Sequence, residues 1–529
     1  MPPTGEISRT GRTVAGRPWL FTMLSAAADS HGARTAIHEA AGNTGVTYTE
    51  LKEASADFAR HARGAGVRPG DTIGLLSDNR LEFVLSLFGL SSLGAAAALI
   101  DPRVAPGEVR ARLQAVGARA VLTTTPSENG IWPVPAFPVR AHRDSHGLAL
   151  TLTMDSHTSL ADCGQGSPAL PPGCELILFT AGSTGRPKAV PLTGTNLGSS
   201  VGGLISSLGL GPSDATLLAM PLFHGHGLMG GLLATLASGG RVALPSSGRF
   251  SAHSFWPEMT DLGATWYTAV PSIHQILLLR ASSEYPGPGK APLRFIRSCS
   301  APLSAATARK LTSTFHAPVV RAYGMTETAH QTASAQLNHL VSSDEGYVGV
   351  PTGVEVGIIA SDGSPVPIGE EGEIVVHGPS VMPGYLGDDS ADPALAGGRF
   401  RTGDLGRVDA DGALHLTGRI KELINRGGEK ISPESVESVL AQHPQVVEAV
   451  AFGIPDPLYG ERVAAAVTLA GGSTATPDAL RAFCGEHGSG ILVPDRIMIV
   501  PRMPLTAKGT ADRRALVSRA TSDEGSVPR

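Results

Sequence analysis

Four short segments of the chain concentrate hydroxyl, carboxylate and basic side chains that suit nucleotide chemistry. The first is TAGSTGRPK at 180–188, which follows the apolar run 176–179. Its glycines and small hydroxylated residues let backbone amides and hydroxyls close around phosphate oxygens, and Lys188 adds a positive charge. The Gly-x4-Gly-Lys-Ser/Thr spacing of a Walker loop is absent. The segment therefore predicts a phosphate-binding loop of a different kind.

The other three segments supply complementary groups. RAYGMTE at 321–327 places an aromatic ring, a hydroxyl and a carboxylate close together, which suits stacking on a base, bonding to a phosphate and holding Mg2+. RTGDLGRVDADGALHLTGRIKELI at 401–424 sets Asp404 fifteen residues before Arg419. A carboxylate suits a ribose diol, and a guanidinium suits phosphate oxygens. PLTAKGT at 504–510 offers a lysine near the end of the chain.

In this order and spacing, the four segments resemble the core motifs of the adenylate-forming superfamily, which comprises acyl-CoA synthetases, adenylation domains and luciferases. The resemblance covers residues 30–516. It implies ATP, Mg2+ and CoA as cofactors and a small carboxylic acid as the substrate. The acid would be activated as an acyl-adenylate and then transferred to the CoA thiol, so the chain is expected to be an AMP-forming acid–CoA ligase.

The resemblance also implies, position by position, which side chains bind the nucleotide. The phosphate set is Thr180, Ser183, Thr184, Gly185 and Lys188. The adenine and ribose set is Tyr323, the loop at Ser300 and Ala301, Asp404 and Arg419.

The implied catalytic set is Lys508, Thr326, Glu327, Arg419 and His224. Glu327 would bind Mg2+, and Lys508 would bridge the carboxylate and the α-phosphate during adenylation. Such charges offset the repulsion between a carboxylate and an anionic phosphate. Lys421 would be the hinge on which a small domain turns between the half-reactions, and Gly427 and Gly428 would line the route of pantetheine.

The acid pocket is expected from PLFHGHGL, ATWYTAVPSIHQ, RSCSAPLS and the TAHQ stretch, which resemble the oxalate–CoA ligase branch of the superfamily. The expected lining is His224, His226, Trp266, Ser298, Ser300, His330 and Gln331. This set is polar, as a second carboxylate requires, whereas a fatty-acyl tunnel would be apolar. His274 and Arg297 are expected to be structural.

Two departures from the branch keep other substrates open: Gly324 stands where alanine is usual, and the stretch after Gln331 differs. Ala189 stands where the superfamily commonly has glycine, which matters little unless the position needs a positive φ. Oxalate or a similar small polar acid is favoured. The alternatives are an aryl acid–CoA ligase, a diazotase that adenylates nitrite, and a luciferase-like binding protein without ligase activity. An amino-acid adenylating enzyme is disfavoured, because residues 229–233 contain no acid to hold an ammonium.

The sequence pattern around these residues predicts an α/β fold. Strand-like and helix-like stretches alternate up to residue 330, which favours a large domain of two helix-covered, mostly parallel sheets. Short strands and turns at 346–418 predict a small β subdomain, and an α+β lid domain is expected to follow. The predicted division is 1–418, with 1–17 disordered, then a hinge at 419–421, then 422–529, with 519–529 disordered.

Composition sets limits on the function. A chain of 529 residues with 42% hydrophobic and 17% charged residues predicts an ordinary globular protein of two or more domains. A net charge of −5 without a basic stripe argues against nucleic acid. The apolar run 81–100 contains Glu82 and two glycines, so it predicts a buried helix and strand rather than a membrane span. A cytoplasmic monomer or homodimer without a fused carrier domain is expected.

Overall fold

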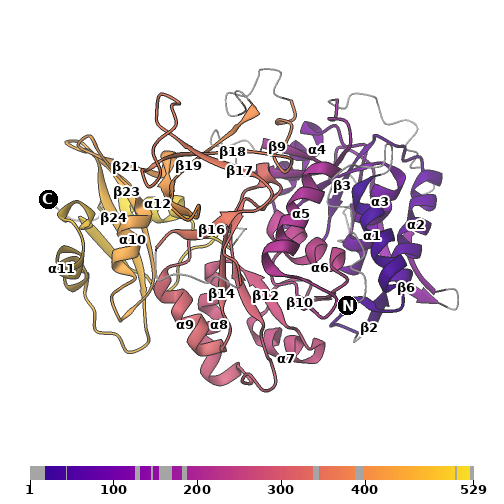
Figure 1. Cartoon of the computed structure of the whole chain (residues 1–529), viewed down its shortest axis with the longest axis horizontal. Helices are drawn as coiled ribbons and strands as arrows, with labels where there is room; N and C mark the ends of the chain where they lie inside the picture. The colour runs from indigo at the N-terminus through magenta and orange to yellow at the C-terminus, as the bar shows by residue number, and fades with distance from the viewer. Residues whose placement is uncertain are drawn as a thin grey trace.

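The computed structural model describes residues 18–42, 44–124, 132–144, 147–153, 169–180, 188–337, 345–387, 395, 398–506 and 509–524. Three sheets organise these residues, and Figure 1 shows them along the long axis of the molecule, from the indigo N-terminal sheet to the yellow C-terminal one. The candidate site residues come mainly from the middle sheet and its connections.

The N-terminal sheet has seven strands among the described residues. Pairs from β6 to β8 are parallel, and an antiparallel strand closes each edge. The order is β7 (Gly147–Leu152), β6 (Ala136–Asp144), β5 (Ala120–Thr123), β3 (Thr72–Leu76), β4 (Ala96–Ile100), β8 (Cys174–Thr180) and β9 (Lys188–Thr193).

The middle sheet is the longest, with thirteen strands among the described residues. Its order is β17 (Glu355–Ile359), β18 (Gly372–His377), β19 (Phe400–Val408), β20 (Leu414–Arg419), β16 (Tyr347–Pro351), β15 (Ala333–Ser334), β14 (Val319–Tyr323), β13 (Phe295–Ser298), β12 (Trp266–Ala269), β10 (Ala215–Leu217), β11 (Arg241–Leu244), β1 (Thr35–Glu39) and β2 (Thr44–Thr47). Strands β14 to β1 pair in parallel. The predicted β subdomain is the antiparallel part, which continues this sheet through β15 and β16.

Helices cover both sheets, as the alternating pattern predicted. They are α1 (Trp19–His31), α2 (Tyr48–Gly64), α3 (Leu81–Leu93), α4 (Pro106–Ala115), α5 (Gly194–Leu208), α6 (Ala234–Ala237), α7 (Ala252–Leu262), α8 (Pro271–Glu284) and α9 (Ala305–Phe315). The largest core cluster joins α1, α2, α3 and α5 to both sheets, and α7, α8 and α9 cover the other face of the middle sheet.

The apolar run 81–100 is a buried helix followed by a buried strand, α3 and β4, as expected from its composition. Gly94 ends the helix at φ +82°, a left-handed conformation that glycine adopts freely. Within the described residues, no helix is both long and apolar enough to span a membrane.

The C-terminal sheet has five strands in the described part of the chain: β22 (Glu429–Ile431), β21 (Ile424–Arg426), β24 (Gly460–Leu469), β23 (Val446–Asp456) and β25 (Arg496–Ile499). Helices α10 (Pro433–Leu440), α11 (Pro477–His487) and α12 (Arg513–Glu524) pack on it. The predicted disorder from 519 is wrong up to 524, because α12 continues there and buries Ala520. Residues 1–17 and 525–529 lie outside the described residues.

Two hydrogen bonds join the C-terminal part to α8. The Gln275 amide donates to the Val447 carbonyl at 2.9 Å, and the Ser272 hydroxyl donates to the Gly509 carbonyl. The loop just before α12 therefore lies against the first turn of α8.

Candidate active site

The first cluster joins three residues that the sequence places far apart. The Tyr323 hydroxyl, at the end of β14, donates to the Asp404 carboxylate at 2.6 Å. Arg419 Nε pairs with the other Asp404 oxygen at 2.6 Å, because antiparallel β19 and β20 set the two residues opposite each other. Burial and the Asp404 charge raise the pKa of Tyr323 well above its ordinary value. The ring therefore stays neutral beside a fixed carboxylate.

A second cluster surrounds the proposed metal ligand. Glu327 is buried in a short 3-10 turn, Thr326–Thr328, in which Thr326 is half-buried. The Tyr385 hydroxyl donates to Glu327 at 2.7 Å, and the Lys188 ammonium lies 4.2 Å from the centre of the Tyr385 ring. Tyr385 thus connects the lysine of the phosphate loop to the carboxylate. The sequence reasoning missed Tyr385, although an aromatic residue beside Gly384 was a usable signal.

The phosphate loop itself is only partly described. Thr180 ends β8, Lys188 begins β9, and the two pair directly across the antiparallel ladder. The predicted residues Ser183, Thr184 and Gly185 lie outside the described residues. Lys508 does too, but its neighbour Gly509 is held by Ser272, as described above.

A third cluster, called the acid end because the acid pocket is predicted there, surrounds a stretch of π-helix, His226–Leu233. His226 Nε2 lies 2.6 Å from the Thr268 hydroxyl, and its Nδ1 lies 3.0 Å from the Ser300 hydroxyl. The ring also stacks on His330, with centroids 5.1 Å apart. Burial, followed by the charges of nearby basic groups, lowers the pKa of His226 well below its ordinary value. A neutral imidazole therefore connects the π-helix to β12 and to the loop after β13.

Arg297 belongs to the same cluster, although the sequence suggested a structural residue. It is fully buried on β13, directly beside Thr268 in the sheet register. Its Nη1 donates to the Thr268 hydroxyl at 3.2 Å, and its Nη2 donates to the Gln331 amide oxygen at 2.8 Å. Gln331 in turn donates to Thr352 at 3.1 Å. The signal that could have found Arg297 is strand parity, because side chains level on adjacent strands share a face.

His330 occupies an unusual backbone conformation next to this arginine. Ala329 and His330 have φ of +51° and +82°, both in the left-handed region that residues with side chains rarely adopt. A Cβ on Gly324 would lie 1.6 Å from the His330 carbonyl oxygen, so glycine at 324 is required for this path. Burial, and then the Arg297 charge, lowers the pKa of His330 well below its ordinary value.

Two residues predicted for the pocket, Ser298 and Trp266, make no side-chain hydrogen bond to this cluster among the described residues. Ser298 follows Arg297 on β13, so its side chain belongs to the opposite face. The Trp266 ring is fully buried against Phe295, with centroids 5.1 Å apart, in the core between the sheets. A place for these two residues in the acid pocket stays a prediction. His274, predicted to be structural, is fully buried beside Tyr267, and burial lowers its pKa to about 3.

The remaining predicted residues lie around these clusters. His224 is half-buried at the entry to the π-helix, with its ring against Phe223 at 4.8 Å. Ala301 follows Ser300, which is exposed and has φ +71°. Lys421 lies in the 3-10 turn Ile420–Glu422 after Arg419. Gly427 and Gly428 form the turn between β21 and β22, both with positive φ.

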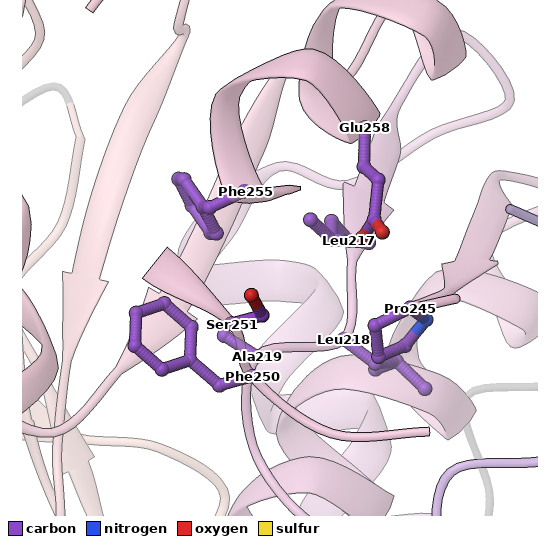
Figure 2. A pocket seen from close by; sticks show the side chains of 8 residues that line it. All are labelled: Leu217, Leu218, Ala219, Pro245, Phe250, Ser251, Phe255 and Glu258. Carbon is purple, nitrogen blue, oxygen red and sulfur yellow. The ribbon is translucent and has the colours of Figure 1, made fainter. Parts of the chain in front are cut away.

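A small pocket elsewhere contains none of these residues. Figure 2 shows it between the end of β10, the loop before α7 and α7 itself, lined by Leu217, Leu218, Ala219, Pro245, Phe250, Ser251, Phe255 and Glu258. Its mostly apolar walls offer little to a nucleotide or an anionic acid.

Known proteins match the whole arrangement. The family model of AMP-binding enzymes matches residues 24–386, and that of the AMP-binding enzyme C-terminal domain matches residues 435–510. An oxalate–CoA ligase of Arabidopsis thaliana is 40% identical over 89% of this chain and 93% of the relative. A sulfoacetate–CoA ligase of Cupriavidus necator is 33% identical over 90% of this chain and 92% of the relative.

A solved structure, ATP-bound MatB of Rhodopseudomonas palustris, superposes with a TM-score of 0.82 at 24% identity and covers 96% of this chain and 99% of MatB. The fold therefore agrees with that of MatB. The chain belongs to the AMP-binding enzyme family and is an adenylate-forming acid–CoA ligase.

Proposed function

We propose that the chain activates a small, polar carboxylic acid with ATP and transfers the acyl group to CoA, with oxalate as the leading candidate. The observation that carries this proposal is the polar acid end, where buried Arg297, His226 and His330 meet Thr268 and Gln331. An apolar acyl chain placed against these groups would leave buried donors without partners, at about 1–3 kcal/mol each.

The relatives support the same substrate class. Two of them are named for the acids oxalate and sulfoacetate, and both of these are short acids with a second anionic group. They lend weight to a polar acid but do not by themselves select one for this chain.

The nucleotide would bind at the first two clusters. Asp404, fixed by Tyr323 and Arg419, offers carboxylate oxygens to the ribose hydroxyls. Thr180 and Lys188, at the two ends of the phosphate loop, would hold the β- and γ-phosphates together with Ser183, Thr184 and Gly185. Thr326 would contact the α-phosphate.

The donor set at Glu327 fits Mg2+. A single buried carboxylate, oriented by Tyr385, suits an ion that takes most of its other ligands from phosphates and water. When bound, Mg2+ would neutralise charge on the phosphates. The chain's own part is to keep Glu327 in place and Lys188 near the phosphates.

The reaction would run in two steps. In the first, a carboxylate oxygen bonds to the α-phosphorus and the bond to pyrophosphate breaks, with Lys508 stabilising the developing charge. In the second, the CoA thiolate attacks the acyl carbon and AMP leaves. We propose that Lys421 is the pivot of a lid beginning at 422 and that Gly427 and Gly428 flank the pantetheine. The contact of Gly509 with Ser272 supports an orientation suited to the first step.

A panel of acids tests this proposal. ATP–pyrophosphate exchange is measured with oxalate, malonate, acetate, octanoate, a cinnamate-type acid and nitrite, and AMP and thioester are then measured with and without CoA. We expect exchange with short polar acids at least about 100-fold above octanoate. Octanoate or cinnamate as the best substrate would overturn the polar-acid proposal, and AMP release with nitrite alone would indicate a diazotase.

The Lys508→Ala variant separates the two steps. It should lower adenylation by on the order of 100-fold or more and leave thioester formation from a supplied acyl-adenylate nearly unchanged. An equal loss in both steps would contradict the assignment of Lys508. Monomeric or homodimeric assembly and a cytoplasmic location stay predictions from the sequence.

A further inference from the structure

Arg297 is a buried positive charge surrounded by neutral groups. Its hydrogen bonds go to Thr268 and Gln331, with a further contact to Cys299. Across the described part of the chain, no ion pair includes Arg297, whereas its neighbour Arg294 pairs with Asp214 at 2.9 Å. A buried charge without a counter-charge is costly, because neutral acceptors replace only part of its hydration. An anionic ligand would supply such a counter-charge.

Two nitrogens of the cluster also have no hydrogen-bond partner among the described residues. They are Arg297 Nε and His330 Nε2, both on side chains at least nine-tenths buried. Buried polar atoms are nearly always paired in native proteins, so each of these calls for an explanation. A bound substrate that accepts hydrogen bonds would supply one.

The imidazole of His330 and the guanidinium of Arg297 both lie next to Gly230. A Cβ built on this glycine would lie 3.1 Å from His330 Nε2 and 3.2 Å from Arg297 Nη1. The imidazole and the guanidinium thus face the same side of the π-helix, where the backbone carries no side chain. Stretches of π-helix are rare and occur frequently at functional sites.

The backbone at His330 indicates that this placement is maintained against strain. Its positive φ, and that of Ala329, is tolerated because Gly324 leaves room for the His330 carbonyl and the Ser200 hydroxyl donates to the Ala329 carbonyl at 2.5 Å. Strained residues of this kind persist where the surroundings enforce them, and they cluster at ligand sites.

We propose that Arg297 and His330 bind the second, non-reacting carboxylate of a short dicarboxylic acid and so determine the enzyme's preference for dianionic acids. This inference rests on the proposed function, because it assumes that the acid enters beside the π-helix. The guanidinium supplies charge and paired donors, and a neutral imidazole supplies one N–H. The other carboxylate is then left to react with ATP.

A purely structural arginine would behave differently. If Arg297 only tied β12, β13 and Gln331 together, its loss would weaken the fold and affect every acid alike. If it binds a carboxylate, its loss affects only acids that carry the second charge. Matched acids separate these cases, because oxamate and malonamate keep the size of oxalate and malonate and replace one carboxylate by a neutral amide.

The experiment compares kcat/KM for acid-dependent ATP–pyrophosphate exchange in wild type, Arg297→Met and Arg297→Lys. In wild type we expect oxalate to exceed oxamate about 100-fold or more, since a site built for a charged group rejects its neutral analogue. Arg297→Met should lower the oxalate value about 100-fold and the oxamate value less than about threefold, and Arg297→Lys should retain part of the preference. The Kd of ATP, measured by calorimetry, should stay within about twofold in both variants.

Gly230→Ala provides a second variant in case Arg297→Met does not fold. Its methyl group would press against both nitrogens and displace them by a few tenths of an ångström, so oxalate should lose more than oxamate. Two matched controls are Gly202→Ala, at a helical glycine with nothing within 4 Å, and Arg294→Met, which removes an arginine that already has a carboxylate partner. Neither should change the oxalate-to-oxamate ratio.

The outcomes are distinguishable from failure of the proposed function. An unchanged oxalate-to-oxamate ratio in folded Arg297→Met and in Gly230→Ala would overturn the inference. So would a wild-type enzyme that activates acetate or oxamate best, although acid–CoA ligation would then stand. Absence of exchange with every acid would instead overturn the proposed function itself.

Discussion

Two arginines of this chain lie in opposite electrostatic surroundings. Arg513, in the C-terminal part, contacts Glu422 and Glu437 at 2.7 Å and Glu434 at 3.7 Å. Arg297, at the acid end, is bonded to a hydroxyl and an amide. The first arginine is satisfied by the chain's own carboxylates and joins the 3-10 turn Ile420–Glu422 to α10 and α12. The second keeps its charge uncompensated within the described residues, as expected where a substrate brings the counter-charge.

The same contrast separates two kinds of charged group in the candidate site. Asp404 and Glu327 already have partners in Arg419 and Tyr385, so the nucleotide end is held in place before a ligand arrives. The acid end has donors in excess. Substitutions at the nucleotide end should therefore reduce activity with every acid, whereas substitutions at the acid end should change which acid is preferred.

The largest effect after loss of Arg297 is expected for His330→Ala. The variant should lower kcat/KM for oxalate about 50-fold, because a buried donor to the second carboxylate is lost, and should lower that for oxamate less than about fivefold. Exchange kinetics with the two acids measure the difference. His253→Ala, at an exposed histidine of α7, is the matched control. Equal losses with both acids would remove His330 from the proposed anion site.

A smaller effect, on stability and not on selectivity, is expected for Arg513→Met. Removing the arginine leaves three carboxylates close together and should destabilise the C-terminal part by about 2 kcal/mol, less than for a fully buried pair because the side chain is 29% exposed. Urea unfolding measures the change, with exposed Arg514→Met as the control. A shift in the oxalate-to-oxamate ratio would show that the two arginines are not as different as their surroundings indicate.

Tyr385→Phe tests the nucleotide end. The variant keeps the ring beneath Lys188 and removes the hydroxyl that donates to Glu327. We expect the Mg2+ concentration for half-maximal exchange to rise, and activity at fixed Mg2+ to fall, by about tenfold with every acid, since one hydrogen bond to a charged group contributes about 1.5 kcal/mol. Mg2+ titrations with two acids check this result. An unchanged titration would leave Tyr385 with a purely structural function.

The smallest effect concerns pH. Burial, only partly opposed by Arg513, raises the pKa of Glu437 from its ordinary value near 4.5 to about 7. The folded state therefore holds a proton that the unfolded state releases, so stability is fully present below pH 4.5 and decreases as the pH rises through 7. Glu437→Gln should remove most of this dependence. Thermal unfolding from pH 5 to 8 measures it, and a wild-type Tm that rises over this range would contradict it.

Much of the fold followed from local pattern. The capping box Thr47–Glu50 begins α2, proline begins α4 and α8, and the apolar run at 81–100 is α3 and β4. These features depend on residues a few positions apart, so a sequence shows them directly. One expectation was not met, because α12 extends into the stretch predicted to be disordered. The predicted β subdomain is present as the antiparallel part of the middle sheet.

The sequence by itself determined the chemistry of the nucleotide end. Phosphates and ribose are bound by short contiguous motifs, because backbone amides and a few fixed side chains are enough for a ligand that is always the same. The motifs predict this role for Thr180, Lys188, Tyr323, Glu327, Asp404 and Arg419, and the structure brings these residues together in two clusters. Nucleotide binding by them stays a prediction. Tyr385 was not predicted, because it comes from a segment outside the four motifs.

Only the tertiary structure decided the acid end. Four separate segments supply its residues, which are His226, Thr268, Arg297 and His330. These side chains come together only because β12 and β13 align and the π-helix packs against them, so no single segment predicts the cluster. Arg297 and Ser298 are adjacent in sequence but lie on opposite faces of β13, and Arg297 is the one that contacts this cluster. A substrate pocket depends on which distant side chains share a face, and that is set by packing and register rather than by any local run of residues.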